Sequence, residues 1–453
     1  MQPTEATPLA ASSSEEEERR KLPRDAPALN VFRLFAALHI VAFHQNAFGG
    51  PPHAFDGPST GNSFAQWGPA WLPFFFMLSG FGPVHSRLCK TPVGRDDAVR
   101  CKDVLPSPQT LLRRLVSVWP TYAFALIIGF ISINNPSLPE RNWALFMLEL
   151  LLIHHWFTNT LRAQLLVATG HPAASLQSSD FNDILSYNGP DWYVSVLAFY
   201  WLFENACFEL GAVAARRGAL GLGVAFGVLL LFMLWPPAAF PLIWGYGPPQ
   251  LPAFLWWLNT DLLIHMHQYA AGVLLAFFLH HRANEGSPPV FGTYCACSVG
   301  TVVFFALLFL LPRSDSNTVY QWGTLFGAFM PLYALIVAGC LESTRDYLPW
   351  LLSKWPMPTI AADFALPIYV LQAPALQIFF GVINQPSVNR LRDESEPFRM
   401  VVGIISPILL GLVSVFLLQK PANKLAKWMM PATFGGAKKA AEATGETKGD
   451  GNA

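Results

Sequence analysis

The chain has 453 residues, of which 53% are hydrophobic and only 13% are charged, and its formal net charge is zero. Soluble domains carry about a quarter charged residues, so this composition excludes an ordinary soluble protein. The balanced charge gives no indication of a nucleic-acid partner. Repeated apolar stretches of about 20 residues instead predict an all-α, polytopic, integral membrane protein whose main surroundings are the lipid bilayer.

Residues 1–28 form a polar segment in which an acidic run, Glu15 to Glu18, precedes several basic residues. This composition is typical of a disordered tail. Its length and its acidic run distinguish it from a cleavable signal peptide. Basic residues directly before the first apolar stretch predict that the N-terminus is cytoplasmic.

Eleven apolar segments follow along the chain and are candidates for membrane spans. Their approximate ranges are 29–48, 68–86, 111–134, 143–157, 191–213, 219–243, 261–281, 292–312, 321–342, 360–382 and 400–419. The tail after these segments is rich in lysine, which predicts a cytoplasmic C-terminus. Two cytoplasmic termini require an even number of spans, so we expect about ten rather than eleven.

The weakest candidate is 143–157, because it is short and carries Glu149, His154 and His155. We interpret it as a re-entrant or half-buried segment. An additional crossing within 158–190 or near 244–258 would satisfy the same parity, and both alternatives stay open.

The stretch that follows the last span reads PANKLAKWMM and is amphipathic, so we expect it to lie in the membrane interface. Residues 429–453 are predicted to be a disordered cytoplasmic tail. The domain prediction is therefore a single membrane domain over 29–428, flanked by two tails.

The first apolar segment carries Arg33 and His44, eleven residues apart. Eleven residues are about three helical turns, so the two side chains share one face and lie about 16 Å apart along the axis. An ionisable pair on a membrane helix normally faces a polar interior. His44 is a candidate catalytic base, because imidazole can exchange a proton at neutral pH. The alternative is that His44 is a packing histidine. His39 lies about 140° round the helix from His44, so it faces elsewhere and is not the favoured candidate.

Three arginines are candidates for binding an anionic ligand. Arg33 starts the first span, and Arg113 and Arg114 start the third. Guanidinium groups bind phosphate with paired hydrogen bonds, so three of them around one cavity mouth would suit a multiply anionic donor such as a CoA thioester. The alternative is that these arginines only anchor the topology of the chain.

The six cysteines are scattered through the chain and belong to no CxxC or HExxH motif. We interpret them as small buried hydrophobic residues rather than as metal ligands or disulfide partners. The sequence therefore predicts no metal site.

Five patches resemble, in order, the acyltransferase-3 family of integral membrane O-acyltransferases. They are Arg33-x10-His44, PFFFMLSGF (73–81), RRLVSVWPTY (113–122), DWYVSVLAFY (191–200), and IYVLQAP (368–374) with QKPANKL (419–425). Each patch alone is weakly specific. Together the patches extend over nearly the whole region from 29 to 428, and their order and spacing make the set more specific.

The resemblance implies an enzyme that transfers an acyl group, often acetyl, from acyl-CoA to a hydroxyl group of a carbohydrate or lipid-linked acceptor. Acyl-CoA would be a substrate, and no cofactor would be permanently bound. His44 would be the catalytic base or acyl relay, and Arg33 and Arg114 would bind the donor. The residues expected to line the site are Ser79, Gly80, Phe81, Trp192, Ser195 and Tyr369.

The chain departs from the family pattern at four positions, which are Ser117, Leu197, Gln372 and Gln419. These departures leave open a catalytically degenerate relative that acts as a scaffold or regulator. A transporter or channel is a further alternative, motivated by ionisable residues within apolar segments. The two halves of the sequence show no matching broken helices, which a repeat-built transporter would usually have.

Overall fold

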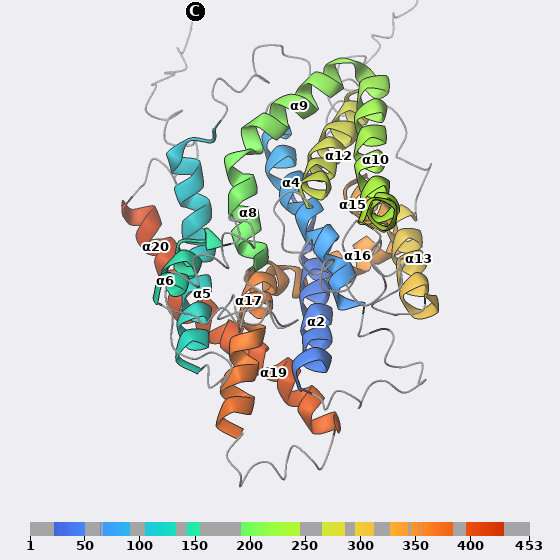
Figure 1. Cartoon of the computed structure of the whole chain (residues 1–453). Coiled ribbons are helices and arrows are strands. Elements are labelled where there is room, and N and C mark those ends of the chain that lie inside the picture. Colours follow the sequence, from blue (N-terminus) through green and yellow to red (C-terminus); the bar gives the residue numbers. More distant parts are fainter. Residues whose placement is uncertain are drawn as a thin grey trace, which may run out of the picture.

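The computed structural model describes residues 22–49, 64, 67–90, 105–132, 143–154, 192–244, 265–285, 295–311, 327–342, 346–354, 356–383 and 396–429. Every regular element within these ranges is a helix, which confirms the all-α prediction (Figure 1). Each predicted apolar segment overlaps at least one of these helices.

The helices form one bundle. Their bounds are α2 Pro27–Gly49, η1 Gly68–Trp71, α4 Leu72–Leu88, α5 Pro108–Ser132, α6 Trp143–Leu150, α8 Trp192–Leu202, α9 Glu204–Arg216, α10 Gly218–Trp244, α12 Met266–Asn284, α13 Ala296–Leu310, α15 Met330–Glu342, α16 Tyr347–Lys354, α17 Met357–Ile383, α19 Glu396–Ser414, the π-helical turn η7 Val415–Gln419, and α20 Lys420–Met429. The short helix α16 was not predicted.

Three of the described helices are long and apolar enough to cross a membrane, namely Pro27–His44, Pro108–Ile131 and Val401–Trp428. The pair α8 and α9 would make a fourth span, although its two parts meet at an angle of 61°. Three further apolar stretches are shorter, namely Gly218–Leu231 within α10, Ala296–Leu310 and Met330–Glu342. The ten-span topology and the cytoplasmic termini stay predictions.

The segment interpreted as re-entrant contains only a short helix. Helix α6 has 8 residues, about 12 Å at 1.5 Å per residue, whereas the hydrocarbon core of a bilayer is about 30 Å thick. After α6 the chain turns at Leu152, whose φ of 61° is left-handed. The described part of this segment therefore does not cross a membrane as one helix, which agrees with the favoured interpretation.

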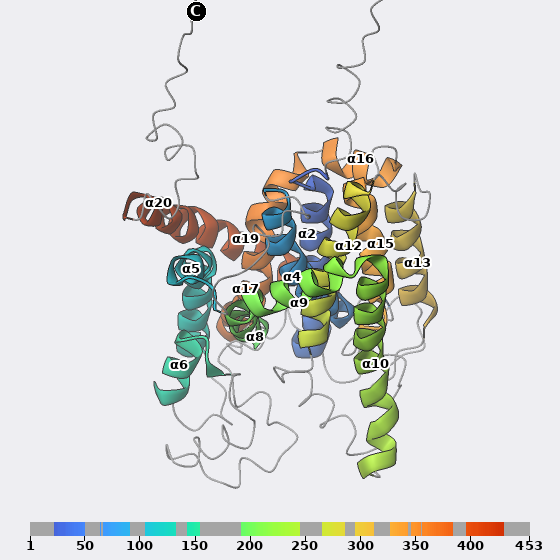
Figure 2. The same cartoon turned by 90° about the horizontal axis from the view of Figure 1, so that it is seen from above.

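Helix α2 lies at the centre of the bundle, where it contacts α15, α16, α17 and α19 (Figure 2). Beside it, α4 and α12 pack closely through two glycines. A Cβ atom on Gly80 would overlap the carbonyl oxygen of Tyr269, and one on Gly272 would overlap that of Met77. Small residues of this kind let helix backbones approach closely in membrane proteins.

The N-terminal end of the domain differs from the prediction. Residues 22–28, predicted as part of a disordered tail, pack on the bundle, because the Pro23 carbonyl accepts a hydrogen bond from His85 Nε2 at 3.0 Å and α2 already begins at Pro27. At the C-terminal end, α20 continues α19 through the π-helical turn, and the interfacial location of the amphipathic stretch stays a prediction.

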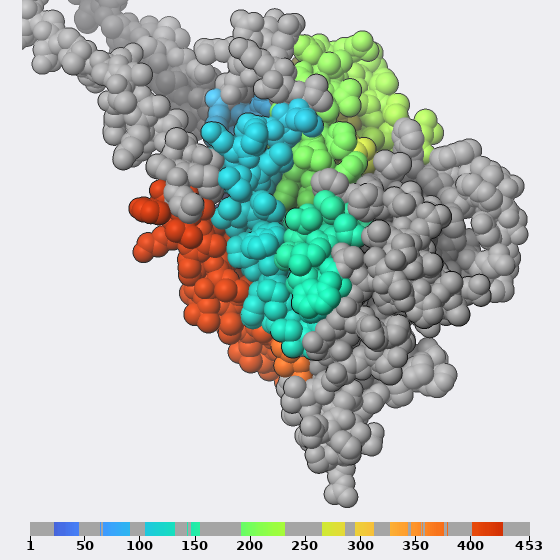
Figure 3. All heavy atoms as spheres, turned by 60° about the vertical axis from the view of Figure 1, so that its left-hand side comes forward, coloured from blue at the N-terminus to red at the C-terminus, as the bar shows by residue number. Residues whose placement is uncertain are grey.

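The outer surface of the bundle is apolar along several helices. Figure 3 shows the face on which α5 lies between α6 and the red α19–α20 helix. Exposed apolar side chains on this and other outer faces include Ile131, Leu220, Leu310 and Leu417. Contiguous exposed apolar surface is typical of a protein that contacts lipid, and it agrees with a membrane location.

Candidate functional site

A cavity of about 780 Å³ lies at one end of the bundle. Its wall is formed where α2, α5 and α17 begin and where α4 and α15 end, so helices of alternating direction all place a terminus here. The cavity therefore opens at one end of the bundle rather than through its side. Its charged lining residues are Arg24, Asp25, Arg33, Arg114 and Asp363.

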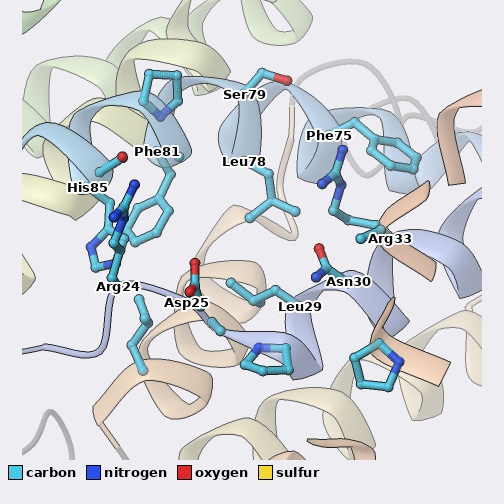
Figure 4. Close-up of a pocket in the computed structure, with 18 of the residues that line it drawn as sticks. Arg24, Asp25, Leu29, Asn30, Arg33, Phe75, Leu78, Ser79, Phe81 and His85 are labelled. Atoms are coloured by element: carbon cyan, nitrogen blue, oxygen red, sulfur yellow. The ribbon is translucent and has the colours of Figure 1, made fainter. Parts of the chain in front are cut away.

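Arg33 projects from α2 into this cavity. Figure 4 shows its guanidinium between Phe75 and Leu78. No ion pair or hydrogen bond joins Arg33 to another residue in the described part of the chain. Tyr193 is the polar group beside it, and the Tyr193 hydroxyl lies 3.1 Å from Ser79 Oγ. The guanidinium can therefore bind an anion without first breaking a salt bridge.

Arg114 reaches the same cavity from α5. It forms an ion pair with Glu204, the first residue of α9, so the bend between α8 and α9 positions the carboxylate. Nη1 of Arg114 is buried and has no hydrogen-bond partner within the described residues. One part of this guanidinium is therefore held in place, while another keeps donors to offer.

Arg24 lies at the opposite end of the cavity from Arg33, beside His85 and Phe81 (Figure 4). Two carboxylates, Asp25 and Asp363, also line the cavity, and Asp363 pairs with Lys420 at 3.3 Å. Because Arg114 is paired with Glu204 and Asp363 with Lys420, the remaining charges of the wall are those of Arg24, Arg33 and Asp25. They leave a small excess of positive charge, which favours an anionic ligand.

Arg113 is exposed and is not part of the cavity wall. Consecutive residues of a helix point about 100° apart, so Arg113 and Arg114 cannot both face the cavity. The third arginine of the cavity wall is instead Arg24. The geometry gives Arg113 no contact with this cavity, and its role in donor binding stays untested.

His44 lies further along α2, half-buried and outside the cavity wall. Its Nδ1 is 3.0 Å from Oε1 of Gln372 on α17. If Nδ1 carries the proton and donates it to this oxygen, Nε2 keeps a lone pair and can act as a base. Gln372 is fully buried, and its amide nitrogen has no partner in the described part of the chain.

The shared cavity that the sequence predicted for Arg33 and His44 contains only Arg33. Tyr369 lies one turn before Gln372 on α17, and its ring is 5.5 Å from the Tyr193 ring and 6.1 Å from the Phe75 ring. Both of these partners line the cavity. Tyr369 therefore lies behind the inner wall of the cavity, on the way to Gln372 and His44.

His39 is a packing residue of the core. Its Nε2 donates to the Phe64 carbonyl at 2.7 Å, and its Nδ1 accepts from Trp71 Nε1 at 2.8 Å. Its ring also stacks on the Phe64 ring at 4.3 Å. Both nitrogens of His39 are thus occupied.

The six residues expected to line the site divide into three groups. Ser79 and Phe81 line the cavity. Gly80 packs against α12 instead. Trp192, Ser195 and Tyr369 are buried behind the wall; Ser195 Oγ donates to the Leu152 carbonyl at 2.8 Å, which holds α8 against the end of α6.

The positions that depart from the family pattern have different surroundings. Ser117 donates to the Arg114 carbonyl at 2.7 Å. Gln419 donates to the Val116 carbonyl at 3.0 Å and so joins η7 to α5. Leu197 is buried. Gln372 alone contacts a candidate catalytic residue.

Sequence reasoning missed three residues of the cavity region: Arg24, Tyr193 and Glu204. Arg24 was assigned to the tail. Tyr193 lies in the same patch, directly after Trp192, but only Trp192 and Ser195 of that patch were predicted to line the site. Glu204 is an acidic residue near the middle of a long apolar stretch, and that was a usable signal.

Three comparisons with known proteins bear on identity. A family model described as an acyltransferase domain matches residues 27–418, which is most of the chain. No curated protein and no solved structure matches it.

Proposed function

Because the chain belongs to the acyltransferase-3 family, we propose that it is a multi-pass membrane O-acyltransferase that uses acyl-CoA, often acetyl-CoA, as its donor. The acceptor would be a hydroxyl group of a carbohydrate or of a lipid-linked molecule. The observation that carries this proposal is the cavity whose wall contains Arg24, Arg33 and Arg114.

The cavity suits the nucleotide end of the donor. CoA carries several phosphate groups, and guanidinium binds phosphate through two parallel hydrogen bonds. Arg33 has no competing partner within the described residues, and Arg114 keeps Nη1 unpaired. Basic residues gather at this end of the bundle, including Arg24, Arg114 and Lys420. By the positive-inside rule this end would face the cytoplasm, where acyl-CoA is found.

His44 and Gln372 would carry out the chemistry. Nε2 of His44 takes the proton from the acceptor hydroxyl, and the oxygen attacks the carbonyl carbon of the thioester. The carbon–sulfur bond then breaks, the acyl ester forms, and the CoA thiolate leaves and receives the proton from His44. The buried amide nitrogen of Gln372 can donate a hydrogen bond to the oxygen that becomes negative during attack.

A donor bound at Arg33 has to extend along α2 to reach His44. Arg33 and His44 are about 16 Å apart along α2, and the cavity ends before His44. The extended arm of CoA would have to pass Tyr369, so the proposal requires this ring to move aside when the donor binds. The Tyr369 ring packs on the rings of Tyr193 and Phe75, so its movement would have to break these two ring contacts.

The test uses the full chain purified in detergent, with radiolabelled acetyl-CoA. We expect saturable binding that free CoA competes for, and release of CoA that depends on an added hydroxyl acceptor such as a glycan or glycolipid fraction. Absence of binding would refute the donor assignment. Binding without any transfer would favour the degenerate relative, and substrate flux into liposomes in the absence of CoA would favour the transporter.

A further inference from the structure

A second cluster of reactive side chains lies where α4 and α12 end side by side. It consists of His85, Cys89 and His280, and one ligand atom from each lies within 4.8 Å of the others. His85 Nδ1 is 3.0 Å from His280 Nε2. The Cys89 sulfur is 3.7 Å from His85 Nε2 and 4.0 Å from His280 Nε2.

We propose that this cluster binds a divalent transition-metal ion, with Zn²⁺ as the best match to its donors. Two imidazoles and one thiolate are the ligand types that zinc prefers. With Zn–N bonds of about 2.0–2.1 Å, two nitrogens of a tetrahedral site lie about 3.3 Å apart. The spacing between His85 and His280 is close to this value, so the ion requires little rearrangement of the two rings.

The surroundings of His85 fit a metal ligand. Its Nε2 is 3.0 Å from the Pro23 carbonyl, and donation of the Nε2 proton to that carbonyl leaves the Nδ1 lone pair facing His280. Metal-bound histidines generally donate their second nitrogen to a carbonyl or carboxylate in this way. The Phe81 ring stacks on His85 with centroids 5.1 Å apart and limits its rotation.

The helices bring the three ligands together by simple geometry. His85 and Cys89 are four residues apart, so they lie on one face of α4. The close contact of α4 with α12 at Gly80 and Gly272 then places His280 opposite them. A metal here would tie Pro23, α4 and α12 together at the edge of the cavity, which His85 also lines. Three protein ligands leave a fourth position for water.

This inference does not depend on acyl transfer, and its test needs no activity. The full chain is purified in detergent, stripped with a chelator and titrated with Co²⁺, which reports thiolate ligation by a charge-transfer absorption band. We expect one Co²⁺ per chain, the thiolate band, and displacement of Co²⁺ by Zn²⁺. Zinc should also raise the thermal unfolding temperature.

Two matched pairs of variants make the test specific. Cys89→Ser and His280→Asn should each abolish the band and the stabilisation by zinc. Cys207→Ser, at another free cysteine, and His281→Asn, at the neighbouring histidine that pairs with Glu285, should leave both intact. Elution of every variant as a monodisperse peak controls for folding.

The proposal is overturned if the wild-type chain binds substoichiometric Co²⁺, or if Cys89→Ser keeps the thiolate band. Either result would mean that His85 and His280 form only a buried hydrogen bond. Acyl transfer that persists without metal would not contradict the metal site, because the ion is proposed to stabilise the fold. Loss of the proposed enzyme activity would likewise not affect the measured stoichiometry.

Discussion

Replacing Arg33 by alanine tests the donor site without disturbing the rest of the bundle. Arg33 lines the cavity and forms no ion pair with a described residue, so its removal leaves no buried carboxylate without a partner. Arg114→Ala would be a poorer test, because it would strip Glu204 of its counter-charge in a partly buried position.

The expected effect follows from the contact that Arg33 would make. Hydrogen bonds to charged groups contribute about 1.5–3 kcal/mol, and each 1.4 kcal/mol corresponds to about tenfold in affinity. Arg33→Ala should therefore raise the Kd for acetyl-CoA by about 10- to 150-fold. Arg33→Lys keeps the charge but loses the planar fork, so its effect should be smaller.

The assay is equilibrium binding of radiolabelled acetyl-CoA to the detergent-purified variants, with thermal unfolding as a check on folding. Arg113→Ala is the matched control, because Arg113 is exposed and lies outside the cavity. Its Kd should equal that of the wild type. The reasoning is refuted if Arg33→Ala binds as tightly as the wild type, or if Arg113→Ala weakens binding equally.

Two further predictions concern packing and the oxyanion donor. Gly272→Ala should destabilise the protein by about 1–3 kcal/mol, because the new Cβ would overlap the Met77 carbonyl oxygen. The measurement is the thermal unfolding temperature, which should fall. Gly227→Ala is the control and should not destabilise, since a Cβ there meets nothing within 4 Å. Equal stability of the two variants would contradict the close packing of α4 on α12. Gln372→Met should lower the rate of transfer by about 10²-fold with the donor Kd unchanged, and an unchanged rate would exclude Gln372 as a hydrogen-bond donor to the thioester.

The sequence predicted those features that depend on hydropathy, segment length and helical periodicity. The all-α class, the positions of the apolar segments and the non-spanning nature of 143–154 follow from hydropathy and length. The helical angle of about 140° between His39 and His44 predicted that His39 faces elsewhere. The contacts that it makes there, with Phe64 and Trp71, depend on other segments of the chain.

What the sequence could not provide depends on tertiary contacts. Which of two adjacent arginines faces the cavity is decided by the rotation of α5 about its axis, and both carry the same charge. The partner of His44 is Gln372, which is 328 residues away. The cluster of His85, Cys89 and His280 likewise depends on the approach of two helices, although the His-x3-Cys spacing on α4 was visible.

The sequence predicted least about the inner end of the cavity. Periodicity placed Arg33 and His44 on one face, and the structure places both near α17, but Tyr369 lies between the cavity wall and the His44–Gln372 pair. Whether a helix face lines an open passage depends on side chains from other helices, which the sequence of that helix does not specify.

The most direct test of the central claim is the turnover of His44→Ala at saturating acetyl-CoA, measured together with its donor Kd. A general base of this kind contributes about 10²- to 10⁴-fold in rate, so CoA release should fall by that factor while the Kd stays unchanged. Turnover equal to that of the wild type would contradict the account, since acyl transfer would then proceed without the imidazole.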